Sequence, residues 1–138
     1  MSEAIKQQRD VMSVPTDRKY CKTHEWFLAQ GDVVTLGITQ FAADELTDIT
    51  YVELPTVGAR FSAGDAIAEI ESVKATSEIF TAIAGEVIEV NGNLEDHPEL
   101  VNDSAFEEGW MIKLKPDSLE PLESLLDAKA YASHQEGS

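Results

Sequence analysis

Two strand-like segments flank a single lysine in the middle of the chain, and this arrangement constrains the fold more than any other feature. AIAEIE (66–71) alternates apolar residues with glutamates, and EIFTAIAG (78–85) is rich in β-branched and aromatic residues, so both are typical of β-strands. The residues between them, 72–77, predict the bend of a hairpin. Lys74 is therefore expected at the hairpin tip. The first strand is expected to place Ala66, Ala68 and Ile70 on one face and Glu69 and Glu71 on the other.

Other segments of the chain predict further short strands and short helices. A period of two, or a run of β-branched residues, predicts strands within 32–39, 48–54, 85–91 and 110–115. Thr39 is expected to cap a short helix over 41–46. Leu122, Leu125 and Leu126 follow a helical period that continues to Lys129 or Ala130, which predicts a C-terminal helix. These elements together favour an all-β sandwich or flattened barrel with helical additions.

The length of the chain, 138 residues, fits one domain with its own core. Residues 1–17 are polar and aperiodic, so we expect a flexible N-terminal lead-in. The domain is expected over 18–132, followed by a short tail over 133–138.

The charge of the chain narrows the classes of partner. Ten basic residues against twenty-six acidic ones give a net charge of −16, which opposes binding to nucleic acid or to an anionic membrane. No apolar run approaches the length of a membrane span, and the first residues lack the apolar core of a secretory signal. Cys21 is the only cysteine, so no intramolecular disulfide can form. A reducing, soluble compartment is expected, most simply the bacterial cytoplasm.

The sequence offers no recognisable catalytic or metal-binding pattern. There is no G-x-S-x-G nucleophile motif and no glycine-rich phosphate loop before a helix. The three histidines, His24, His97 and His134, have no second ligand at metal spacing. We therefore predict neither catalytic residues nor a metal site.

Lys74 has two interpretations on residue pattern alone: an ordinary solvated lysine, or a site of covalent attachment. A hairpin tip offers an ε-amine to a modifying enzyme, while the strands behind it hold its position. Gly58 lies sixteen residues before this lysine (74 − 58) and Gly85 eleven after it (85 − 74). Both glycines are expected to supply positive φ at tight turns and so to set the geometry of the hairpin.

The segment ESVKATSE, with its two spaced glycines, resembles the lipoyl-lysine hairpin of lipoyl domains. The flanking blocks, in order and spacing, resemble the H-protein family of the glycine cleavage system over about residues 19–132. This resemblance implies a mainly β, lipoyl-domain-like barrel-sandwich hybrid with short helices and a C-terminal helix. The blocks are HEW (24–26), GIT (37–39), YVELP (51–55), GEVIEVN (85–91), PELVN (98–102), GWMIKLKP (109–116) and the closing LESLLDAKAY.

The resemblance implies a carrier protein that is not an enzyme. Lys74 would hold lipoate in amide linkage, attached by a lipoate ligase or an octanoyl transferase. The arm would take the aminomethyl group of glycine from the pyridoxal-phosphate-dependent glycine decarboxylase to the tetrahydrofolate-dependent aminomethyltransferase. Dihydrolipoamide dehydrogenase would then reoxidise the arm. We expect a monomer, in the bacterial cytoplasm, or in the mitochondrial matrix if the source is eukaryotic.

The resemblance also implies residues around the arm. His24 and Glu25 of the HEW block, and Glu78 four residues after the lysine, would contact the arm or its aminomethyl group. Two of the positions in this region depart from the family pattern. Thr47 stands where the family commonly has glycine, and Glu78 stands in place of the usual aspartate.

Two alternatives to this carrier remain open on sequence, and the residues beside the lysine argue against a third. The third is a biotin carrier, which would share the hairpin. Biotin carriers resemble one another in placing methionine on both sides of the lysine, whereas this chain has Val73 and Ala75, and this difference argues against a biotin carrier. A relay protein would pass lipoate to other lipoyl proteins during lipoate biosynthesis. An unmodified interaction module would carry an ordinary surface lysine, and its intact mass would lack a lipoyl group.

Overall fold

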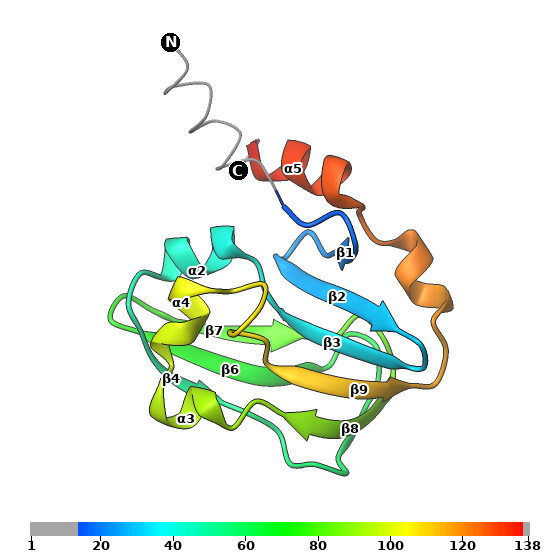
Figure 1. Cartoon of the computed structure of the whole chain (residues 1–138), viewed down its shortest axis with the longest axis horizontal. Coiled ribbons are helices and arrows are strands. Elements are labelled where there is room, and N and C mark those ends of the chain that lie inside the picture. Colours follow the sequence, from blue (N-terminus) through cyan, green and yellow to red (C-terminus); the bar gives the residue numbers. More distant parts are fainter. Residues whose placement is uncertain (1–13, 137–138) are drawn as a thin grey trace.

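Two antiparallel sheets form the body of the protein in the computed structural model, which describes residues 14–136 (Figure 1). The larger sheet has the order β1 (Lys19–Tyr20), β2 (Glu25–Gln30), β3 (Val33–Ile38), β9 (Ile112–Pro116), β8 (Gly85–Val90) and β5 (Arg60–Phe61). The smaller sheet consists of β4 (Ile49–Glu53), β6 (Ala66–Ser72) and β7 (Thr76–Phe80). The helices are α2 (Gln40–Leu46), α3 (Asn93–Asp96), α4 (Glu99–Asp103), a 3-10 turn η1 (Glu120–Ser124) and α5 (Ala128–Glu136).

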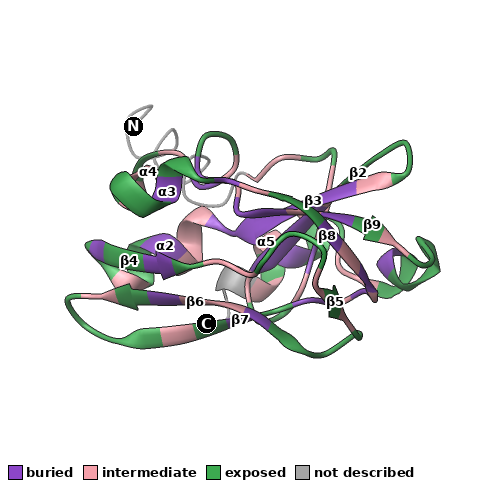
Figure 2. Cartoon of the chain, turned by 90° about the horizontal axis from the view of Figure 1, so that it is seen from below, coloured by how far each residue is buried: buried purple, intermediate pink, exposed green. Residues whose placement is uncertain are grey.

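The apolar residues of both sheets meet in one core. Leu36 of β3, Ile70 of β6 and Val87 of β8 are each 0% exposed, and Figure 2 shows buried residues concentrated on the central strands. Strands form in all the segments where the sequence predicts them. Their β-branched side chains favour extended backbone and pack in the shared core. The predicted mainly β fold with short helices and a C-terminal helix is confirmed.

The hairpin of β6 and β7 is confirmed, but two details of the prediction are wrong. A bulge between Ala66 and Ala68 places Ile67 in the core and leaves Ala66 exposed, so Ala66 does not share a face with the buried Ile70. Since a bulge inserts one extra residue, it reverses the face that each preceding side chain occupies. The bend is also shorter than 72–77, because β6 continues through Ser72 and β7 begins at Thr76.

The predicted continuous C-terminal helix is split in two. Leu125, with φ −82° and ψ 167°, is extended and ends η1. Leu126 then pairs with Tyr20 through two backbone hydrogen bonds of 2.8 and 2.9 Å. This pairing with β1 satisfies backbone groups that a continuing helix would have used, so α5 begins only at Ala128.

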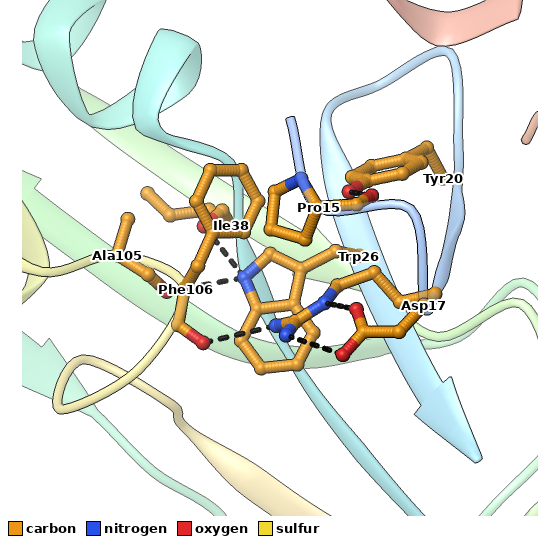
Figure 3. Close-up of polar contacts among 8 residues, drawn as sticks. Pro15, Asp17, Tyr20, Trp26, Ile38, Ala105 and Phe106 are labelled. Atoms are coloured by element: carbon orange, nitrogen blue, oxygen red, sulfur yellow. Dashed lines mark hydrogen bonds and ion pairs between the residues drawn. The ribbon is translucent and has the colours of Figure 1, made fainter. Parts of the chain in front are cut away.

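Trp26 anchors the larger sheet to the loop after α4 (Figure 3). Its indole N–H donates to the carbonyls of Ile38 (2.9 Å) and Ala105 (3.1 Å). Arg18 covers the outer face of the ring, with its guanidinium carbon 4.6 Å from the ring centroid, and donates to the carbonyl of Phe106 at 2.9 Å. A ring that is 1% exposed thus has its one polar group satisfied.

Gly58 and Gly85 are required for different structural reasons. Gly58 has φ +96° and donates its N–H to Val87 O at 2.7 Å, as expected for a turn glycine. The expectation of positive φ at Gly85 is wrong. Gly85 is a strand residue at which an added Cβ would lie 2.5 Å from Lys115 O, so close approach of two backbones excludes a side chain there.

The bounds of the domain, 18 and 132, remain a prediction from the sequence. Most of the lead-in predicted over 1–17 lies outside the described residues, and Val14 packs against the cluster of Tyr20, Trp26 and Tyr131. Helix α5 runs from Ala128 to Glu136, across the predicted boundary at 132.

Helix α2 begins as predicted and ends in a strained residue. Thr39 caps it, accepting a hydrogen bond from the N–H of Ala42 at 3.3 Å. Thr47 follows the helix with φ 61° and ψ −146°, close to a region that is essentially restricted to glycine. Asn102 holds this turn by donating to Thr47 O (2.7 Å) and accepting from the N–H of Ile49 (3.0 Å). A β-branched residue here carries backbone strain.

The two sheets are joined by the carboxylate of Glu25, at the start of β2. This side chain is 1% exposed; one oxygen accepts from the backbone N–H of Phe80 in β7 at 3.0 Å, and the other from the hydroxyl of Thr23. Burial raises the pKa of Glu25 above its ordinary value, while the two hydrogen bonds oppose that shift. This buried carboxylate accepts two hydrogen bonds, one of them from β7, and therefore joins the two sheets.

We expect Glu25→Ala to lower the free energy of unfolding by about 2 kcal/mol, since the N–H of Phe80 loses its partner. Glu25→Gln keeps an acceptor and should cost less than about 1 kcal/mol.

Because the folded pKa of Glu25 is raised, its stabilising contribution is lost as the pH rises through that pKa. The glutamine variant should therefore gain stability relative to the parent as the pH rises above about 4, where an ordinary glutamate ionises. Chemical denaturation at a series of pH values measures the free energy of unfolding of each protein. Equal losses of this free energy for Glu25→Ala and Glu25→Gln would contradict a role of the carboxylate in joining the sheets.

We expect Thr47→Gly to raise the free energy of unfolding by about 1 kcal/mol. Relief of backbone strain, roughly 1–3 kcal/mol, exceeds the extra unfolded-state entropy of glycine, roughly 0.4–1 kcal/mol. Thr56→Gly is the matched control, because Thr56 is an exposed loop residue without positive φ, and it should lose stability. A destabilised Thr47→Gly protein would show that Thr47 is not strained.

Candidate functional site

A tight, internally hydrogen-bonded turn presents Lys74. The N–H of Ser72 donates to Ala75 O at 2.8 Å, and the Ser72 hydroxyl oxygen accepts from the N–H groups of Lys74 (3.1 Å) and Ala75 (3.0 Å). The N–H of Val73 donates to Asp48 O at 3.0 Å, which fastens the tip to the segment after α2. Lys74 is exposed on a turn whose backbone is held on both sides.

The amine of Lys74 lies beside helix α2. Its Nζ donates to the backbone carbonyl of Glu45 at 3.1 Å. Glu45 also lines a groove of about 310 Å³ between α2, the residues before β2, and β7. The lysine amine therefore stands at the edge of this groove. Its full lining is Thr23, His24, Ile38, Phe41, Ala42, Glu45, Leu46, Ser77, Glu78 and Ile79.

His24 occupies the groove wall in an unusual backbone conformation. Its φ is +76°, and its backbone is held by hydrogen bonds from its N–H to Cys21 O and from the N–H of Thr39 to its carbonyl, both 2.9 Å. The imidazole packs on Phe41 with ring centroids 4.8 Å apart. Its Nδ1 lies 2.7 Å from the hydroxyl of Tyr131 in α5. Burial, followed by the nearby His134, lowers the pKa of His24 below its ordinary value.

The two acids predicted as arm contacts occupy different layers of the structure. Glu78 is exposed on β7 and lines the groove beside His24. Glu25 is not among the lining residues; it lies beneath them, bonded to Thr23 and to Phe80. The structure thus brings His24 and Glu78 together at the groove and places Glu25 behind them.

Other predicted residues lie away from this site, and one groove residue was missed. Gly58 and Gly85 contact the β5–β8 region of the larger sheet and do not line the groove. Glu45 was not predicted from sequence, although its carboxylate shares the groove with Glu78. The predicted cap at Thr39 was the signal available, since it starts the helix that carries Glu45.

Other classes of site find little support in the described part of the chain. Among residues 14–136, no group of three or more histidine, cysteine or acidic side chains is arranged to hold a metal ion. No helix within those residues is long and apolar enough to cross a membrane. What the geometry offers is a primary amine on a rigid exposed turn, beside a groove that has apolar walls and is also lined by the residues Glu45 and Glu78.

Comparisons with known proteins agree on one family. Residues 18–137 match the family model described as glycine cleavage H-protein. The chain is 52% identical over 120 residues to a glycine cleavage system H protein of Thermus thermophilus, covering 87% of this chain and 94% of the relative. It is 46% identical over 125 residues to one from Anaeromyxobacter sp. strain K, covering 91% and 98%.

A solved structure shows the same fold. The crystal structure of a glycine cleavage system H protein from Mycobacterium marinum is similar to this chain with a TM-score of 0.81 and 35% identity. The similarity covers 91% of this chain and all of the other. The predicted barrel-sandwich fold is confirmed by this likeness. With this fold, a presented lysine at the tip of the β6–β7 hairpin and close relatives over nearly the whole chain, the protein belongs to the glycine cleavage H-protein family.

Proposed function

We propose that the chain is a non-catalytic carrier that holds lipoate in amide linkage on Lys74 and transports the aminomethyl group of glycine. The observation that carries this proposal is the position of the Lys74 amine, exposed on a rigid turn and 3.1 Å from the Glu45 carbonyl at the groove edge. Family membership supports the carrier role in glycine cleavage. An amide formed at this amine would begin beside a groove in the same molecule.

The residues of the groove fit a lipoyl arm. Ile38, Phe41, Leu46 and Ile79 give it apolar walls, which suit an alkyl chain. Glu45 and Glu78 add two carboxylates, which suit a cationic amine at the end of that chain. When attached, the lipoyl group supplies the sulfur that accepts the aminomethyl cargo and the length that lets it reach other active sites.

The chain itself protects the cargo. A protonated amine has no lone pair with which to expel sulfur, so carboxylates that favour the ammonium form slow loss of the cargo. The apolar walls limit access of water to it. Glu78 and Glu45 act directly in the groove, and Glu25 supports them by fixing β7 against β2.

The partners follow from this role. Glycine decarboxylase would load the carrier, the aminomethyltransferase would unload it, and dihydrolipoamide dehydrogenase would reoxidise it. A lipoate ligase or an octanoyl transferase would attach the arm. The net charge of −16 favours a monomer that docks transiently on these enzymes. The location that we propose is the bacterial cytoplasm.

We expect Lys74→Ala and Lys74→Arg to fold normally and to lose carrier activity. The side chain is exposed, so the free energy of unfolding should change by no more than about 0.5 kcal/mol. Neither variant can form the lipoyl amide. Intact mass after co-expression with a lipoate ligase tests this, because only the parent should gain one lipoyl group. A parent protein that stays unmodified under these conditions would overturn the proposed function and favour an interaction module.

We expect Glu78→Gln to lose its aminomethyl cargo roughly two to five times faster than the parent, since one carboxylate that favours the ammonium form is removed. Glu69→Gln is the matched control: Glu69 faces Glu78 across the strands but does not line the groove. The spontaneous release of the cargo amine from purified loaded protein measures the rate. Equal rates in all three proteins would show that these carboxylates do not protect the cargo.

A further inference from the structure

A chain of hydrogen bonds connects the groove with the C-terminal helix α5. The Tyr131 hydroxyl lies 2.7 Å from Nδ1 of His24 and 2.7 Å from the hydroxyl of Thr39. Thr39 in turn accepts from the N–H of Ala42 at 3.3 Å. Thr39 and Tyr131 are both 0% exposed, whereas His24 lines the groove. A groove residue is thus linked through the Tyr131 hydroxyl to the buried hydroxyl of Thr39.

The direction of these hydrogen bonds follows from the needs of the Thr39 hydroxyl. Among residues 14–136 its partners are the N–H of Ala42, which can only donate, and the Tyr131 hydroxyl. The Thr39 proton must therefore go to Tyr131, and the Tyr131 proton to Nδ1 of His24. In the opposite direction a buried hydroxyl would lack an acceptor, which costs roughly 1–3 kcal/mol.

This direction determines the tautomer of His24. If Nδ1 accepts a hydrogen bond, the neutral ring carries its proton on Nε2. Protonation of Nδ1 would either set two donors against each other at the Tyr131 hydroxyl or force both hydrogen bonds to reverse. Within the described residues, Nδ1 makes the only hydrogen bond of the ring, so Nε2–H is the polar group that His24 can offer to the groove.

We propose that Tyr131 is a positioning residue that holds His24 uncharged, as the Nε2–H tautomer, in the wall of the groove. The effect of this tautomer on the cargo rests on the proposed carrier function. The tautomer itself does not depend on that function. A neutral His24 leaves Glu45 and Glu78 as the charges that line the groove. An imidazolium would repel an ammonium cargo there and cancel part of the attraction.

Other charged and titratable groups near His24 come from several elements. His134 of α5 has its ring centroid 5.6 Å from that of His24, and its charge would oppose protonation of His24. Glu45 of α2 favours protonation. Glu78 lines the same groove, and Glu25 precedes Trp26 in β2, close enough to act on Tyr131. With burial, the balance lowers the pKa of His24.

The first test uses unlipoylated protein, so that it does not depend on the arm. Proton–nitrogen correlation spectra of the ¹⁵N-labelled imidazoles report tautomer and charge directly between pH 5.5 and 8, with exposed His97 as internal reference. We expect His24 to be the Nε2–H tautomer at neutral pH. In Tyr131→Phe, we expect a mixture of tautomers and a titration midpoint higher by roughly 0.5–1 unit.

Tyr20→Phe is the matched control. Tyr20 stacks on Tyr131 with centroids 4.8 Å apart, but its hydroxyl bonds to the carbonyl of Pro15, so the same chemical change there should leave His24 unaltered. Thr39→Ser keeps both hydrogen bonds and should also leave it unaltered. An Nδ1–H or charged His24 in the parent at neutral pH, or an unchanged titration in Tyr131→Phe, overturns the proposal.

The second test measures release of the cargo from loaded protein. Tyr131→Phe should release it faster than the parent, by a factor of about 2 or more at pH 6 and by less at pH 8, because His24 gains charge only at the lower pH. The same excess at both pH values would indicate a purely structural role and overturn the proposal. Failure of Lys74 to take a lipoyl group would overturn the proposed function alone, since the tautomer is measured without it.

Discussion

The hydrogen bond from the Phe80 N–H to the Glu25 carboxylate determines how the rest of the site is arranged. Sheets pack through apolar surfaces that permit small sliding movements, whereas a buried acceptor and donor specify one relative position. This bond ties β2 of the larger sheet to β7, the strand that carries Glu78 and leads back from the lysine turn. The groove and the hairpin tip thereby keep a defined relation to each other.

Three consecutive residues, His24 and the first two residues of β2, connect three different parts of the molecule. His24 bonds to Tyr131 of α5, Glu25 to Phe80 of β7, and Trp26 to the loop at Ala105. Successive strand residues point to opposite faces, and the positive φ of His24 adds a third direction. One short segment can therefore hold the groove wall, the hairpin and the helical side of the domain together.

The groove combines rigid and strained features in a way that suits a carrier. The turn at Lys74 is closed by its own hydrogen bonds, and Val73 fastens it to Asp48, next to the strained Thr47. The glycine that the family commonly has at Thr47 would adopt this conformation without strain. Strain at His24 and Thr47 is tolerated because neighbouring hydrogen bonds from Thr39 and Asn102 hold both residues in place.

The sequence alone determined the strands, the lysine turn, the helix cap at Thr39 and the family, because periodicity and turn chemistry depend on residues close together in the chain. Tertiary contacts decided the rest. The bulge at Ile67 allows this side chain to pack in the core. The pairing of Leu126 with Tyr20 divides the C-terminal helix. Glu25 is buried beneath the groove only because β7 supplies a donor from 55 residues away. The groove itself exists only where α2, β7 and His24 meet, and local sequence patterns cannot specify contacts between segments so far apart in the chain.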